Sequence, residues 1–84
     1  MIFYIVLCGQ VVGRTVEYST DFELFTFKPN AIKAGFEVRG SDDFNIGVIE
    51  DGKLVRIDWM NEVVDADPTY MAEVSEQIGL EAQP

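Results

Sequence analysis

Residues 44–59 read FNIGVIEDGKLVRIDW, and their pattern decides the fold. The central Asp51-Gly52 favours a type I′ turn, which needs positive φ at both central residues and matches the twist of the flanking strands. With these two residues as the loop, Glu50 faces Lys53. One face of the hairpin is then apolar throughout, with Phe44, Ile46, Val48, Val55, Ile57 and Trp59. A slip of one residue would destroy this sorting, so the turn and the pattern predict the same register.

Three segments before the hairpin have the character of strands. Residues 2–8 are apolar at every position, which is typical of a central strand covered on both faces. Residues 11–18 form a second candidate strand, with Gly13 as a bulge. Residues 22–27 follow a run of turn-forming residues and form a third.

Residues 32–39 have two interpretations. Ile32, Ala34, Phe36 and Val38 alternate with polar or small residues, which favours a strand. A short helix over residues 30–36, beginning after Pro29, is the alternative. Gly35 and the period of two weigh against this helix.

Residues 67–78 predict a helix. Asp67 suits the N-cap and Pro68 the first helical position, where its missing N–H is not needed. Gly79 suits the position just after the helix. The buried stripe is expected to comprise Met71, Val74 and Ile78.

These elements predict an α+β fold, with an antiparallel sheet of about five strands and one C-terminal helix. We expect one compact domain over residues 1–80 and a frayed tail at 81–84. A single helix covers one sheet face at most, yet residues 2–8 are apolar on both. The second face would be covered by strong curling of the sheet towards a small barrel, or by a second copy in a homodimer.

The charge of the chain is concentrated near its C-terminal end. All six basic residues lie within residues 1–56, and seven of the fifteen carboxylates follow them, within a formal net charge of −9. Such an asymmetric field bears on partners and solubility rather than on fold. The basic residues are too few to follow a nucleic-acid backbone, so no direct nucleic-acid binding is expected.

The residue types needed for most catalytic and metal sites are missing. The chain has no histidine and one cysteine, Cys8, which we expect in the strand core. No phosphate-binding glycine loop is present. Asp65-Ala66-Asp67 could offer oxygens to a divalent cation, but helix capping explains Asp67 without a metal. We therefore expect no catalytic residues, no cofactor and no metal.

The apolar N-terminal segment does not resemble a targeting signal. It has neither a basic region before it nor a small-residue cleavage site after it, and it is about a third of a membrane span. We expect no membrane interaction and a cytoplasmic location.

Two side chains near the end of the hairpin each have two interpretations. Arg56 lies in mid-strand, where we expect its guanidinium to pair with Asp58; contact with a bound anion is the alternative. Trp59, expected opposite Phe44, is interpreted as a core residue rather than a platform for a ligand.

The charge pattern indicates a small, non-catalytic interaction or regulatory module that binds a protein with a basic surface. The candidate partner surface comprises the carboxylates Asp58, Glu62, Asp65, Asp67, Glu73 and Glu76. The alternative is a nucleic-acid mimic that, like small phage inhibitors, occupies the groove of a DNA- or RNA-handling enzyme. It requires carboxylates at phosphate-like spacing. An enzyme ranks third and last, because no two residues of the chain can be named as a catalytic acid and base.

Overall fold

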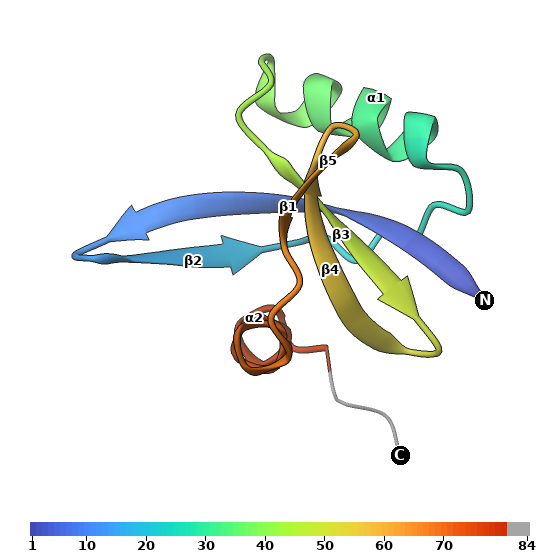
Figure 1. Cartoon of the computed structure of the whole chain (residues 1–84). Helices are drawn as coiled ribbons and strands as arrows, with labels where there is room; N and C mark the ends of the chain where they lie inside the picture. The colour runs from blue at the N-terminus through green and yellow to red at the C-terminus, as the bar shows by residue number, and fades with distance from the viewer. Residues whose placement is uncertain (81–84) are drawn as a thin grey trace.

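One antiparallel sheet runs through the computed structural model, which describes residues 1–80 (Figure 1). Its strands lie in the order β2-β1-β3-β4-β5. Their bounds are β1 (Ile2–Val12), β2 (Thr15–Ser19), β3 (Asn45–Glu50), β4 (Lys53–Trp59) and β5 (Glu62–Asp65). Helix α1 (Lys28–Arg39) lies between β2 and β3 in the chain, and α2 (Pro68–Ile78) follows β5. The α+β class and the five-stranded antiparallel sheet are confirmed, whereas the tail at 81–84 lies outside the described residues.

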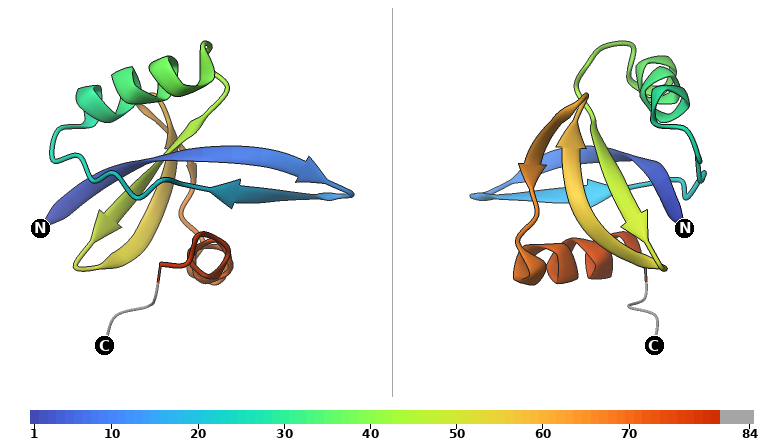
Figure 2. Two further views of the ribbon diagram at one scale, coloured as in Figure 1. Left: turned by 180° about the vertical axis from the view of Figure 1, so that it is seen from behind. Right: turned by 45° about the vertical axis from the view of Figure 1, so that its right-hand side comes forward.

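The two helices cover opposite faces of the sheet (Figures 1 and 2). Strand β1 supplies both cores: Ile5 and Leu7 pack in the cluster that contains α2, while Val6 packs in the cluster that contains α1. This explains why residues 2–8 are apolar throughout. The prediction of a single helix was wrong, and so was the strongly curled sheet, because α1 covers the second face. The physical reason for expecting a second copy on that face is thereby removed.

The strand predicted over residues 32–39 is instead part of α1. Its inward stripe comprises Lys28, Ala31, Ile32 and Gly35, at the i, i+3, i+4, i+7 spacing of a helix, but only Ile32 is a large apolar residue. Gly35 is required at the contact, since a Cβ there would overlap the ring of Phe44. The helix therefore approaches the sheet closely through small residues, a pattern that hydrophobic periodicity does not reveal.

The Asp51-Gly52 turn has the predicted conformation. Both residues have positive φ, 53° and 80°, and Glu50 pairs with Lys53 as expected. Beyond the Ile49–Leu54 pair a β-bulge at Val55 shifts the register by one, so that Val48 faces Arg56. The predicted register is thus correct at the turn and wrong beyond the bulge.

The bulge redistributes the side chains that were expected on one face. Ile57 packs with Leu54 in the α2 core, whereas Ile46 belongs to the α1 core. Val55 and Trp59 are exposed. The Trp59 indole N–H donates to the carbonyl oxygen of Asp42 at 3.0 Å, so the prediction of a core tryptophan was wrong.

Three further differences concern strand bounds. Strand β1 continues to Val12, and the chain turns at Gly13-Arg14 rather than forming a bulge at Gly13. Residues 22–27 contribute a single bridge, from Phe25 to Tyr4. Strand β5 was not predicted, because both of its valines are exposed and its four residues show no alternation.

Helix α2 matches the prediction closely. Its bounds, its N-cap Asp67 and its buried stripe of Met71, Val74 and Ile78 are as expected. Gly79 adopts a left-handed conformation with φ of 75° and ends the helix. Neither α1 nor α2 is long and apolar enough to cross a membrane.

Candidate functional site

The start of α2 gathers carboxylates because capping fixes their positions. Asp67 accepts hydrogen bonds from the backbone N–H groups of Thr69 (2.8 Å) and Tyr70 (3.3 Å). Asp65 accepts one from the N–H of Asp67 at 2.9 Å. Both acids are thus held at the N-terminal end of α2, where the backbone N–H groups have no partner within the helix.

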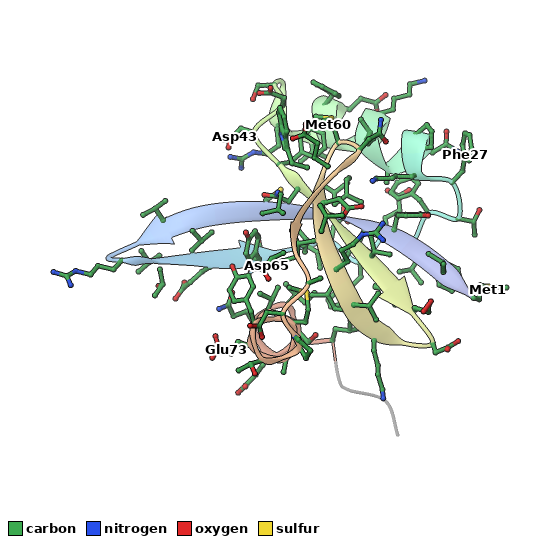
Figure 3. The ribbon with its side chains drawn as sticks, in the orientation of Figure 1. Met1, Phe27, Asp43, Met60, Asp65 and Glu73 are labelled. Carbon is green, nitrogen blue, oxygen red and sulfur yellow. The ribbon has the colours of Figure 1, made fainter. Side chains whose placement is uncertain are left out.

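Glu73 and Glu76 lie one turn apart on the solvent side of α2, and both are exposed. Figure 3 shows Asp65 and Glu73 beside the helix. We call Asp65, Asp67, Glu73 and Glu76 the acidic surface. Within residues 1–80 none of these four carboxylates forms an ion pair, and the ion pairs of the described residues involve Asp43, Asp51 and Asp58 instead.

Tyr70 lies beside the acidic surface, but burial is the main cause of its raised pKa. Burial, the hydroxyl of Tyr18 and the charges of Asp65 and Glu73 together raise the pKa of Tyr70 to about 12. Burial makes the largest contribution. Tyr70 therefore remains a neutral phenol at physiological pH, beside carboxylates that repel a second negative charge.

Glu62 lies away from these four residues. It opens β5 and pairs with Trp59, whereas Asp65 ends the strand nearest α2. Three residues of extended chain separate the two acids by about 10 Å. In Figure 3 the labelled Met60, two residues before Glu62, lies near α1, whereas Asp65 lies near α2.

Asp58, also predicted for the partner surface, is buried instead, with 1% of its side chain exposed. Arg56 donates from Nε to Oδ1 at 2.7 Å and from Nη2 to Oδ2 at 2.9 Å. Lys28 Nζ donates to Oδ2 at 2.7 Å. Burial alone would raise the pKa of Asp58, but the hydrogen bonds and charges of Arg56 and Lys28 outweigh it and hold this pKa below its usual value. The predicted Arg56–Asp58 pair is present.

An open apolar groove of about 830 Å³ borders the acidic surface. One wall is the start of β4, with Leu54 and Val55. The other is the side of α2 that carries Met71, Ala72 and Glu76. This volume falls within the range of about 300–1,000 Å³ typical of ligand sites. The groove could not be predicted from the sequence, because its two walls come from β4 and α2, and no local sequence pattern shows that these elements lie side by side.

Other reactive groups in the described part of the chain form no second site. Residues 1–80 contain no group of three or more Cys, Asp or Glu side chains arranged to hold a metal ion. Cys8 is half-buried and packs against the α1 core, so it is less enclosed than expected.

Comparison with protein-family models, with curated proteins and with solved structures gave no match. The groove and the acidic surface therefore have to be interpreted from their own geometry.

Proposed function

We propose that this protein is a non-catalytic interaction module that binds another protein through the acidic surface and the groove beside it. The observation that supports the proposal is the juxtaposition of four carboxylates that have no ion-pair partner within residues 1–80 with an open apolar groove. A protein interface commonly combines an apolar centre with a charged rim.

The two parts would contribute differently to binding. Exposed carboxylates accelerate the encounter with a basic partner and make the association rate depend on ionic strength, while adding little to affinity. Apolar side chains that fill the groove would supply affinity and slow dissociation. The partner is therefore expected to carry both a basic surface and an apolar anchor.

The test is the association rate of the native partner, captured from the host, at several ionic strengths. Glu73→Gln with Glu76→Gln should slow association several-fold and flatten its salt dependence. Because both side chains are exposed, the free energy of unfolding should change by less than about 0.5 kcal/mol.

The matched control is Glu23→Gln with Glu37→Gln, which removes the same charge from exposed positions outside α2. This control should leave the association rate nearly unchanged. Equal effects of the two double variants would mean that net charge alone matters, and would contradict a role for the acidic surface.

The nucleic-acid mimic predicts a different result in a competition experiment. A mimic occupies the nucleic-acid groove of its target, so DNA or RNA should displace it, with an affinity that falls steeply as salt rises. A partner that binds the groove should be held in the presence of DNA. Full displacement by DNA would favour the mimic.

A further inference from the structure

The first half of β4 has a free backbone edge. Strand β5 pairs with β4 only at Ile57, Asp58 and Trp59, whereas the pairing of β4 with β3 continues to the turn at residues 51–52. Within residues 1–80 no other segment pairs with the outer edge of residues 53–56. Figure 2 shows β5 leaving the side of β4 to lead into α2.

The polar groups on this edge can be assigned from the hairpin geometry. Glu50 and Lys53 flank a two-residue turn, so they form a hydrogen-bonded pair. The next pair, Ile49–Leu54, must then direct its N–H and C=O groups away from the partner strand. The N–H and C=O of Leu54 consequently face outwards from the β3–β4 hairpin, while its side chain is buried in the α2 core.

The same residues form one wall of the groove. Lys53, Leu54 and Val55 face the side of α2 that carries Met71 and Ala72. A ligand in the groove would therefore meet apolar side chains, the opposite charges of Lys53 and Glu76, and a free strand edge together. An extended peptide suits this arrangement, because its backbone can pair with the free edge of β4 while alternate side chains enter the groove.

We propose that the groove binds a short extended segment of the partner by strand addition to β4 at Leu54. An apolar side chain of this segment would pack against Met71 and Ala72, and a neighbouring Lys or Arg would lie beside Glu76. This inference rests on the proposed function in that it takes the partner to be a protein.

Charge favours a basic foreign segment over a second copy of the chain. Strands β2 and β5 are the two edge strands of the sheet; β5 carries Glu62 and Asp65 at its ends, and β2 carries Glu17 and no basic residue. Insertion of β5 from another copy would bring these carboxylates towards Glu76. Like charges in adjacent positions are unfavourable, whereas a basic residue there would be attracted.

The experiment uses the full chain and a display library of short random peptides as the probe. Enriched sequences should alternate apolar and polar residues and contain a Lys or Arg. The best peptide should shift the amide NMR signals of Leu54, Val55 and Ala72. N-methylation of the peptide amide that faces Leu54 should weaken binding about tenfold, because it removes a backbone hydrogen bond but keeps every side chain.

A groove-filling variant and a matched control complete the test. Ala72 is exposed in the groove, so Ala72→Trp should fill the groove and abolish peptide binding, with an unchanged thermal unfolding profile. Lys33→Trp, at an exposed position on α1, should bind the peptide normally.

Any of three results with the peptide would overturn the inference: no enriched peptide, equal binding of the N-methylated peptide, or full binding by Ala72→Trp. Self-association that is lost in Ala72→Trp would instead assign the groove to a second copy and would also overturn it. Failure of the proposed function looks different. In that case the peptide binds at the groove, but neither salt nor the double change Glu73→Gln with Glu76→Gln alters the association rate of the native partner.

Discussion

The core on the α2 side contains eight buried residues, all apolar, whereas the core on the α1 side contains four, beside the buried Asp58. Hydrophobic burial holds α2 in place, together with the hydrogen bond that the Tyr18 N–H donates to Gln77 Oε1 at 3.0 Å, and the outer side of that helix is exposed. Helix α1 depends on the close approach of small residues and on the pair between Lys28 and Asp58. A buried ion pair therefore helps to specify the α1 side of the sheet, while the α2 side carries the surface that we propose for binding.

The largest effect should come from the buried carboxylate. Asp58→Ala leaves Lys28 and Arg56 without their shared partner, and we expect a loss of about 3 kcal/mol in the free energy of unfolding, measured with urea. Asp43→Ala is the matched control, because its pair with Arg39 is exposed and should contribute less than about 1 kcal/mol. Equal losses in the two variants would show that the buried cluster does not hold α1.

The pH dependence of stability should report the same cluster. The folded pKa of Asp58 lies below its usual value of 3.8, so its stabilising effect is present above that value and is lost as the pH falls through the folded pKa. The difference in unfolding free energy between the wild type and Asp58→Asn should therefore shrink as the pH is lowered below 3.8. A difference that stays constant in acid would contradict the ion pairing.

A smaller effect is expected at the hairpin turn that presents β4 to the groove. Gly52 has φ of 80°, which a β-branched residue strongly resists, so Gly52→Val should cost about 1–3 kcal/mol. Gly52→Asn should cost less, because asparagine tolerates positive φ. Urea unfolding of the two variants measures the difference, and similar losses would show that side-chain bulk rather than backbone conformation is responsible.

Removal of the α2 N-cap should have the smallest effect on stability. Asp67→Ala leaves the N–H groups of Thr69 and Tyr70 without their acceptor, and we expect a loss of about 1 kcal/mol. Asp67→Ser should restore most of it, since serine also caps. A loss that serine does not restore would point to the charge of Asp67 rather than to its hydrogen bonds.

The features that could be predicted from the sequence are those with local causes. Asp67, Pro68 and Gly79 mark both ends of α2, and Asp51-Gly52 determines the turn between β3 and β4. Each of these signals acts over a few residues and needs no tertiary contact. The acids on the exposed side of α2 could be predicted for the same reason.

The remaining features depend on contacts between distant segments. Helix α1 could not be predicted because a glycine at position 35 counts against a helix in the sequence. The need for its small size becomes visible only when the ring of Phe44 is seen to pack against it. Asp58 is buried because Lys28, thirty residues earlier, reaches it. The bulge at Val55 moves Ile57 into the α2 core, and it cannot be inferred from alternation alone.

The most direct test of the account is amide hydrogen exchange of the full chain, alone and bound to its captured native partner. We expect the partner to slow exchange at Leu54 and along residues 65–76, because β4 and α2 form the proposed binding surface. Exchange in α1 should be unchanged, since that helix lies on the opposite face of the sheet (Figure 1). Protection confined to α1 or to residues 20–27 would contradict the account and would place the partner elsewhere.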